Sequence, residues 1–224
     1  MSIFTNPFGD GKYQRGEPPK PDEQGSGIII SPDTLRDNRI PPGQSRTRKW
    51  PVLDAYGTPS IDHEKWELKF FGLIENKTSL NLHELNELPQ VNVFADLHCV
   101  TKWSRLGNIW SGVSTKTIAD RIQINPEAKF VIAHGYDQGW TTNIPIENFL
   151  AEDSLLTHTH DGVPISPDHG GPVRLMIPLL YAWKSAKWLR ALEFIDADRA
   201  GFWENGGYHM LGDPWREQRH RWDK

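Results

Sequence analysis

The sequence predicts one α+β domain that is rich in β-sheet, and three observations lead to this class. The chain has 224 residues, a length that suits one domain or at most two. Short apolar runs with strand character outnumber the segments with helical periodicity. Strand and helix patterns also lack the regular alternation that a parallel α/β sheet would produce.

The expected strands are short. Three isoleucines form the first, at 28–30, and residues 66–74 alternate apolar and polar side chains as an amphipathic strand does. Residues 91–96 alternate as far as Val93 and then run into two apolar residues. Further strands are expected at 130–133, 172–178 and 187–194.

Three short helices are expected between these strands. Leucines at 80, 82, 85 and 88 predict a helix over 79–88, which is capped near Ser79 and ends before Pro89. Isoleucines at 118, 122 and 124 predict a second helix over 113–124. A third and shorter helix is expected over 146–150.

The composition limits the organisation, location and partners of the chain. Residues 1–27 are rich in proline, glycine and charge, so we expect a poorly structured arm before a domain over 28–224. A single cysteine excludes an internal disulfide and a four-cysteine metal site. No apolar run approaches the roughly 18 residues of a membrane helix, and no signal sequence is recognisable, so we expect a cytoplasmic protein without membrane contact. The net charge of −4 gives no reason to expect nucleic acid as a partner, and ten tryptophans suggest an aromatic-walled pocket or a rigid core.

Cys99, the single cysteine, follows the expected strand at 91–96. His98, Lys102 and Arg105 lie close to it in sequence. Cationic neighbours lower the pKa of a thiol, and the thiolate is the form that attacks carbon or binds soft metals. The alternative is a small buried hydrophobic residue, which is the commonest role of a lone cysteine.

A second group of candidate residues lies between 169 and 187. His169 and Arg174 flank Gly170 and Gly171, which let the backbone approach a ligand closely. An arginine fork, backbone N–H groups and a lysine at Lys187 together form a grip for phosphate. The alternative is a pair of solvated cations on neighbouring strands.

Taken together, these segments resemble the sulfite-oxidase-like, molybdopterin-dependent oxidoreductases. The resemblance covers most of the chain, from about residue 39 to residue 221. The four segments that carry it are FADLHCVTKWS at 94–104, HGGPVRLMIP at 169–178, YAWKSAKWL at 181–189, and a tail with GFWENGGYH at 201–209 and GDPWREQRH at 212–220.

The resemblance implies an enzyme that binds molybdenum in molybdopterin and transfers an oxygen atom to or from a small molecule with two electrons. Cys99 matches the thiolate that binds the metal. The chemistry agrees, because a soft thiolate suits a metal that the cofactor's sulfur atoms already hold. The resemblance also implies cofactor contacts from Arg39, His134, Asp137, His169, Arg174, Ser185, Ala186 and Lys187.

Two departures from the family bear on the substrate. Sulfite oxidases have a tyrosine just before the glycine that matches Gly201, and an arginine where this chain has Ser104. Both are missing, so the natural substrate is uncertain, with a sulfoxide or an N-oxide as candidates. We expect the substrate pocket to be built from Lys102, Arg105, Trp203, Tyr208 and His209.

The source of electrons is expected to lie outside the chain. One cysteine, no haem-attachment motif and no dinucleotide-binding glycine fingerprint leave no second redox centre in the sequence. We therefore expect an external electron-transfer protein or carrier as a partner.

Three alternatives remain open from the sequence. His158 and His160, on one face of a strand, would suit a zinc or non-haem iron enzyme together with Asp161 or Asp168. Cys99 with a histidine such as His169 would suit a cysteine hydrolase. A non-catalytic cofactor-binding protein of the same fold is the third alternative.

Overall fold

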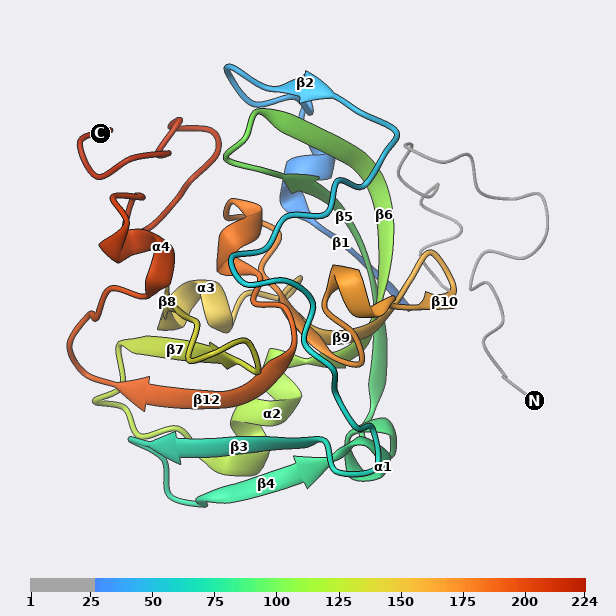
Figure 1. Cartoon of the computed structure of the whole chain (residues 1–224), viewed down its shortest axis with the longest axis vertical. Helices are drawn as coiled ribbons and strands as arrows, with labels where there is room; N and C mark the ends of the chain where they lie inside the picture. The colour runs from blue at the N-terminus through green and yellow to red at the C-terminus, as the bar shows by residue number, and fades with distance from the viewer. Residues whose placement is uncertain (1–26) are drawn as a thin grey trace.

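The computed structural model describes residues 27–224, which form two β-sheets whose strands run in different directions (Figure 1). The first sheet has seven strands. Its path is β1-β5-β6-β9-β10, while β11 pairs with β9 and β2 pairs with β6. Its members are β1 (Ile28–Ile30), β2 (Ser45–Arg46), β5 (Gln90–His98), β6 (Trp103–Ser114), β9 (Leu155–His160), β10 (Val163–Pro164) and β11 (Arg174–Met176).

The second sheet has five strands in the order β4-β3-β12-β7-β8. Its β12 strand runs parallel to β3 and antiparallel to β7, so two segments far apart in sequence meet at its centre. Its members are β3 (Glu67–Gly72), β4 (Thr78–Asn81), β7 (Phe130–Gly135), β8 (Thr141–Pro145) and β12 (Leu189–Ile195).

The helices are short and connect the strands. The helices are α1 (Leu82–Asn86), α2 (Thr115–Ile122), α3 (Ile146–Phe149) and α4 (Phe202–Asn205), with single 3₁₀ turns η2 (Pro32–Leu35), η3 (Pro167–His169) and η4 (Ala182–Lys184). Strand content therefore dominates, and the predicted sheet-rich α+β class is confirmed. Of the described residues, none belongs to a helix that combines the length and apolarity needed to cross a bilayer.

The expected strands are all present with shifted ends, but the helix expected over 79–88 is wrong in its first part. Residues 78–81 form the edge strand β4, and the helix α1 begins only at Leu82. Asn81, not Ser79, is its N-cap. The Asn81 side chain accepts from the backbone N–H of Glu84, and the Glu84 carboxylate accepts from the backbone N–H of Asn81, both at 2.9 Å. This reciprocal capping box fixes where the strand ends and the helix starts.

Besides β4, the strands β2, β6, β8 and β10 were not expected from the sequence, and β9 was implied only by placing His158 and His160 on one strand. β6 is the longest strand of the protein's described part, yet it contains buried polar residues that break the apolar pattern. Asn108 illustrates the reason, because its side chain donates to the carbonyl oxygens of Ala95 and Arg105. Burial of a polar side chain is tolerated when its hydrogen bonds are made inside the protein. Contacts with residues distant in sequence, which the sequence does not reveal, therefore stabilise these segments as strands.

Three groups of buried side chains form the core, and the largest of them holds the two sheets together. The largest includes Phe70 of β3, Val131 of β7, Phe194 of β12 and Leu156 of β9, and so joins both sheets. The second includes Val93, Ala95 and Leu97, which alternate along one side of β5. Cys99 continues this alternation directly after the strand. Residues 1–26, nearly all of the expected arm, lie outside the described residues, so that expectation stays a prediction.

Candidate active site

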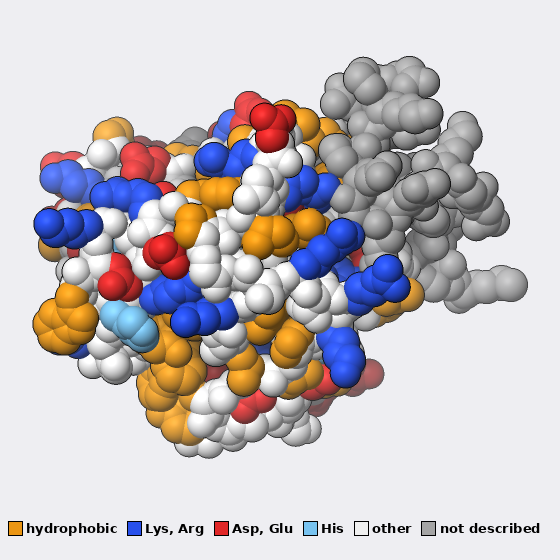
Figure 2. Space-filling view, turned by 90° about the horizontal axis from the view of Figure 1, so that it is seen from above, with side chains coloured by type: hydrophobic (Ala, Val, Ile, Leu, Met, Phe, Trp, Pro, Cys, Tyr) orange, Lys and Arg blue, Asp and Glu red, His pale blue; other side chains and the backbone are white. Residues whose placement is uncertain are grey.

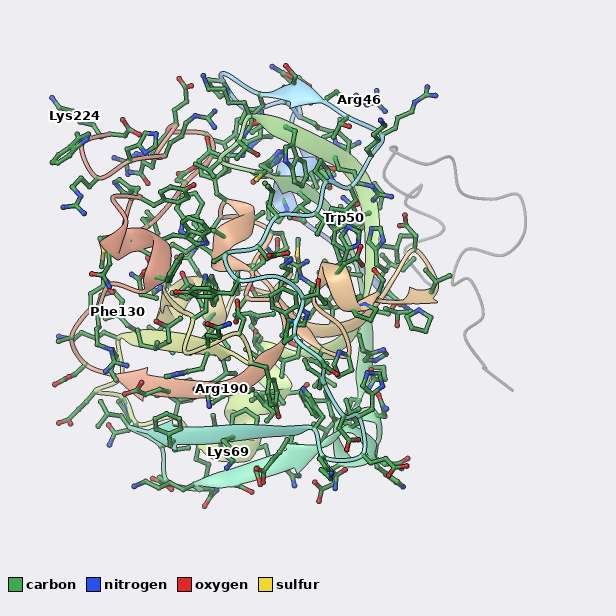
Figure 3. All side chains as sticks on the ribbon, in the orientation of Figure 1. Arg46, Trp50, Lys69, Phe130, Arg190 and Lys224 are labelled. Carbon is green, nitrogen blue, oxygen red and sulfur yellow. The ribbon has the colours of Figure 1, made fainter. Side chains whose placement is uncertain are left out.

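A cavity of about 190 Å³ lies beside the end of β5. It is lined by segments from six parts of the chain, including the irregular stretch at 50–55, whose Trp50 is marked in Figure 3. Six of the lining residues carry the chemistry of the site, namely Trp50, Cys99, Asp137, His169, Arg174 and Lys187.

Cys99 lies at the inner side of this cavity, in a tight turn between β5 and β6. The Cys99 backbone N–H donates to the carbonyl of Trp103 at 2.9 Å, and the Cys99 carbonyl accepts from Lys102 at 3.0 Å. Lys102 takes a positive φ of 70°, which lets the turn close. The Thr101 hydroxyl donates to Sγ of Cys99 at 3.2 Å, so the sulfur atom is fixed in position.

The expectation that His98, Lys102 and Arg105 lower the pKa of this thiol is wrong, because burial outweighs the nearby positive charge, which comes from Arg219. Burial raises the pKa of Cys99, whose exposed fraction is 7%. His98 projects to the other face of β5, and burial lowers the pKa of its imidazole to about 4, so it is uncharged. Arg105 is held by Asp161 at 2.9 Å, and Lys102 is exposed. A bound metal ion would itself deprotonate the thiol, because a coordinating thiol loses its proton.

Arg174 at the start of β11 is the buried cation of the cavity. Nη1 donates to the carbonyl of His169 at 2.8 Å, and Nη2 donates to the carbonyl of Ser185 at 2.9 Å. Nε has no hydrogen-bond partner, and no carboxylate within residues 27–224 pairs with this guanidinium. Burial lowers the pKa of Arg174 to about 10, which still leaves it charged at neutral pH. A buried cation without a counter-charge is costly, so an anionic ligand would stabilise it.

Lys187 brings a second cation to the same wall. Its ammonium donates to the carbonyl of Asp168 at 2.9 Å and lies 4.2 Å from the ring centroid of Trp188. Burial, and next the neighbouring charge of Arg174, lower the pKa of Lys187 to about 8. Gly170 makes this approach possible. A Cβ there would lie 2.7 Å from Cβ of Lys187, and its φ of +101° also favours glycine.

His169 lines the cavity through a ring whose orientation is fixed. Nδ1 is 2.9 Å from the hydroxyl of Ser166, and Nε2 is 3.0 Å from the carbonyl of Trp50. The imidazole also stacks on the indole of Trp50, with centroids 3.9 Å apart. Both ring nitrogens have partners, so the imidazole is fixed as part of the cavity wall. Its contact with Trp50 also attaches the 50–55 segment to that wall.

Asp137 provides an unpaired acceptor near Lys187. Its Oδ1 has no hydrogen-bond partner although the residue is only 6% exposed. Burial raises the pKa of Asp137 to about 6. A buried carboxylate oxygen without a donor needs a partner, and a ring that carries N–H groups would supply one.

The donor set fits the cofactor that the family resemblance implies. Two neighbouring cations, Arg174 and Lys187, suit its phosphate group, and the orphaned oxygen of Asp137 suits the N–H groups of its pterin. The orphaned indole N–H of Trp103 is a further free donor on the cavity wall. The thiol of Cys99 at the same cavity suits molybdenum, a metal bound by soft sulfur ligands. The residues present therefore fit molybdenum–molybdopterin.

Three of the eight expected cofactor contacts lie away from the cavity. Arg39 is bound by Asp96, with nitrogen–oxygen distances of 2.5 and 2.9 Å. His134 lies on β7 and bonds to Glu193 at 3.1 Å. Ala186 is fully buried, and its carbonyl accepts from Leu175, so it serves the backbone network.

The expected substrate-pocket residues also divide. Trp203 and Tyr208 line the cavity, whereas Lys102 points to solvent and Arg105 is buried against Asp161. His209 lines a different surface groove, where its Nδ1 accepts from Leu211 and Gly212. The aromatic wall is larger than expected, because Trp50, Trp103, Trp140, Trp183 and Trp188 also line the cavity. The count of ten tryptophans was the one sequence signal for this wall.

The metalloenzyme alternative has no ligand cluster to support it. His158 bonds to Gln90 at 2.9 Å, while His160 lies 3.1 Å from the amide oxygen of Asn108. A β-bulge between β6 and β9 interrupts the register next to His158. Among residues 27–224, no three His, Cys, Asp or Glu side chains are grouped so as to hold a metal ion. The cysteine-hydrolase pair also finds no contact, since the nitrogens of His169 bond to other groups.

Comparison with known proteins identifies the family. The model of the "Oxidoreductase molybdopterin binding domain" matches residues 55–203. The uncharacterized oxidoreductase YuiH of Bacillus subtilis is 46% identical over 84% of this chain and 95% of its own length. A putative protein-methionine-sulfoxide reductase subunit of Azospira oryzae is 30% identical over 83% of this chain and 71% of its own length.

More distant relatives extend the comparison. The mitochondrial sulfite oxidase of Drosophila melanogaster is 29% identical over 70% of this chain, which matches 32% of that enzyme. The sulfane dehydrogenase SoxCD of Paracoccus pantotrophus has a similar fold, with a TM-score of 0.58 at 21% identity over 63% of this chain and 41% of that one. The matched family model spans more than half of the chain and contains the cavity residues from Cys99 to Trp203. The chain therefore belongs to the family of oxidoreductases with a molybdopterin-binding domain.

Proposed function

We propose that this molybdenum–molybdopterin oxidoreductase reduces a small uncharged oxide, a sulfoxide or an N-oxide, by removing its oxygen atom. When bound, the cofactor supplies a two-electron redox centre that exchanges an oxygen atom with substrate. The overall change for a sulfoxide takes up two electrons and two protons and releases a thioether and one water molecule. The protein's part is to hold the cofactor, to shape the substrate pocket and to exclude water.

The cofactor would be held by residues of three segments. Arg174 and Lys187 would bind its phosphate, because they are adjacent cations without a carboxylate partner at bonding distance. Asp137 would accept from the pterin through its unpaired oxygen. Cys99 would bind the metal through Sγ, which the hydroxyl of Thr101 already orients.

The aromatic wall beside Cys99 is the observation that carries the substrate class. Trp103, Trp183, Trp203 and Tyr208 line the cavity, whereas the arginine and lysine nearest in sequence to Cys99 point elsewhere. With Arg174 and Lys187 bound to the cofactor's phosphate, an anion such as sulfite would lose its hydration against this aromatic wall. Leaving even a polar group unsatisfied there costs on the order of 2–7 kcal/mol. An uncharged oxide loses less and packs its apolar part against the indole rings. The similarity to a putative methionine-sulfoxide reductase subunit supports the same class.

Tyr208 would bind the oxygen atom of the substrate. It lines the cavity, and burial raises the pKa of its phenol, so the hydroxyl keeps its proton at neutral pH. A protonated phenol donates a hydrogen bond to an oxide oxygen and strengthens it as negative charge develops on that atom. Tyr208 would thus take the place of the family tyrosine that is missing before Gly201.

The electrons would come from an outside carrier, as expected from the single cysteine and the missing haem motif. A cytoplasmic location is likewise a proposal, supported by the sequence expectation alone. Cell fractionation with an antibody against the protein would test the location.

Turnover measurements test the proposed reaction. Protein loaded with cofactor should oxidise reduced benzyl viologen when dimethyl sulfoxide, methionine sulfoxide or trimethylamine N-oxide is added. The Cys99→Ser variant should bind pterin and lack this activity, because a hard ligand replaces a soft one. Sulfite with ferricyanide as acceptor should give little turnover. Sulfite oxidation together with no reduction of any oxide would contradict the proposal.

A further inference from the structure

Exposed cations lie next in sequence to two segments that line the cavity. Arg46, Arg48 and Lys49 directly precede Trp50 of the cavity wall, and Lys102 lies in the turn after Cys99. We call these four residues the basic rim. The two segments are neighbours in space. β2 pairs in parallel with β6, and the backbone N–H of Ser45 donates to the carbonyl of Lys102 at 2.9 Å.

The basic rim carries charge that no described residue neutralises in an ion pair. Its four side chains are exposed and form no ion pair with any residue in 27–224. Lys65 and Lys69 differ, since they pair with Asp62 at 3.1 Å and with Glu67 at 3.2 Å, whereas Lys77 and Lys129 are exposed and, like the basic rim, unpaired among the described residues. Residues 36–49 contain five Lys or Arg and one acid, whereas the whole chain has a net charge of −4. The positive charge is therefore local, and it is opposite in sign to the net charge of the chain.

The C-terminal segment adds to the same face. Arg219 donates to the carbonyl of Val100 at 2.9 Å and to that of Pro42 at 3.2 Å, which ties this segment to the turn after β5. Figure 2 shows lysine and arginine side chains spread over this face, with a few acidic ones between them. Figure 3 places Arg46 and Lys224 at the end of the molecule opposite Lys69.

An apolar patch lies next to the basic rim. Val52 and Leu53 are 42% and 55% exposed, and both also line the cavity. They form the part of the cavity wall that reaches solvent, with Asp54 as the one acidic side chain beside them in sequence. A protein that covers these residues would lie close to the cofactor. Cations around a small apolar centre give fast, steered association with weak final binding, which suits a partner that must leave after each turnover.

We propose that the basic rim, with Val52 and Leu53, is the docking surface for an acidic electron-transfer protein. The inference rests on the proposed function, which requires two electrons from outside for each oxide reduced. The carrier is oxidised by two electrons in total, the oxide takes them up with two protons, and water leaves. Location next to segments that line the cavity favours this partner over an anionic membrane surface, which would have no reason to meet the redox site.

Charge reversal tests the docking surface. The probe is an acidic plant-type [2Fe–2S] ferredoxin, and its binding is measured by biolayer interferometry on cofactor-free and loaded protein. The test variant is Arg46→Glu/Arg48→Glu/Lys49→Glu. The matched control is Lys65→Glu/Lys69→Glu/Lys77→Glu, which changes net charge equally at the β3–β4 end of the molecule. All six side chains are exposed, so both variants should fold.

The expected result is specific to the rim. Ferredoxin should bind the wild type. Its affinity should fall by at least about tenfold when the salt concentration rises from about 20 to about 200 mM, because salt screens exposed charges. The rim variant should weaken binding by at least about tenfold, and the control by less than about twofold. Turnover of loaded protein with photoreduced lumiflavin, a small donor that needs no protein docking surface, should stay within about twofold in both variants. Failure of lumiflavin turnover in the wild type would count against the proposed function and leave the binding test intact.

Three outcomes would overturn the docking proposal. The first is equal weakening of ferredoxin binding by the rim variant and the control. The second is no binding of ferredoxin to the wild type. The third is rim-dependent binding to vesicles containing phosphatidylglycerol while ferredoxin does not bind, which would make the surface a membrane contact. Cytochrome c, a cationic protein, should bind no better than background to the wild type.

Discussion

Replacing Lys184 by methionine should strongly destabilise the protein, because this lysine is fully buried at the back of the cavity wall. Its ammonium donates to the Glu204 carboxylate at 2.7 Å and to the carbonyl of Met210 at 2.6 Å. It also donates to the carbonyl and the side-chain oxygen of Asn143, at 3.0 and 2.6 Å. The side chains of Lys184 and Glu204 are both 0% exposed.

The size of the loss of stability follows from the hydrogen bonds that Glu204 would keep in the variant. Its Oε1 also accepts from Trp183 at 2.8 Å and from Thr142 at 2.9 Å, and those bonds survive the substitution. The negative charge of Glu204, however, would be buried without a counter-charge. Breaking a buried ion pair from one side costs about 3–5 kcal/mol. That is a large share of a total stability of about 5–15 kcal/mol.

Urea unfolding followed by circular dichroism measures this loss. Lys69→Met is the matched control, because its pair with Glu67 is exposed at 64% and 42% and should contribute at most about 1 kcal/mol. The double variant Lys184→Met/Glu204→Gln should recover part of the loss, since the uncompensated charge is then gone. A loss below about 1 kcal/mol in Lys184→Met, or a double variant less stable than that single one, would refute the reasoning.

Three further predictions concern the cavity itself. Burial raises the pKa of Asp137 to about 6 in the folded chain, so its contribution to stability is present below about pH 4 and is lost as pH rises through about 6. Asp137→Asn should therefore stabilise cofactor-free protein above pH 6 by about 1–2 kcal/mol, since solvent screens part of the burial effect, and much less at pH 4, as urea unfolding at both pH values will measure. Arg174→Ala should reduce the pterin content of purified protein to below about a tenth, measured by pterin fluorescence after denaturation, because the buried phosphate contact is lost. Tyr208→Phe should lower kcat with an oxide by about ten- to a hundredfold at unchanged molybdenum content and Tm, and unchanged kcat would exclude the hydroxyl from the reaction.

The sequence predicted the fold class and the expected strands because their apolar side chains face one core. It did not predict β6, whose Arg105 and Asn108 are buried and satisfied by partners from β5 and β9. It also misplaced the start of α1, because Asn81 and Ser79 are both good caps and only the pairing of β4 with β3 decides between them.

Some of the predicted site residues lie at the cavity and others do not, for a similar reason. Cys99, His169 and Arg174 lie in motifs whose neighbours are fixed by short turns, so closeness in sequence reflected closeness in space. The cationic neighbours of Cys99 were misread because strand alternation turns His98 to the opposite face, and a salt bridge to Asp161 draws Arg105 away. The 50–55 segment could not be found, since it has no regular structure and reaches the cavity only through tertiary contacts.

The central claim is that the cavity around Cys99, Arg174 and Lys187 holds molybdenum–molybdopterin. Its most direct test is the metal and pterin content of protein purified from a host that makes the cofactor. We predict near-stoichiometric molybdenum by plasma mass spectrometry, together with a fluorescent pterin released on denaturation. One equivalent of zinc or iron without any pterin would contradict the account.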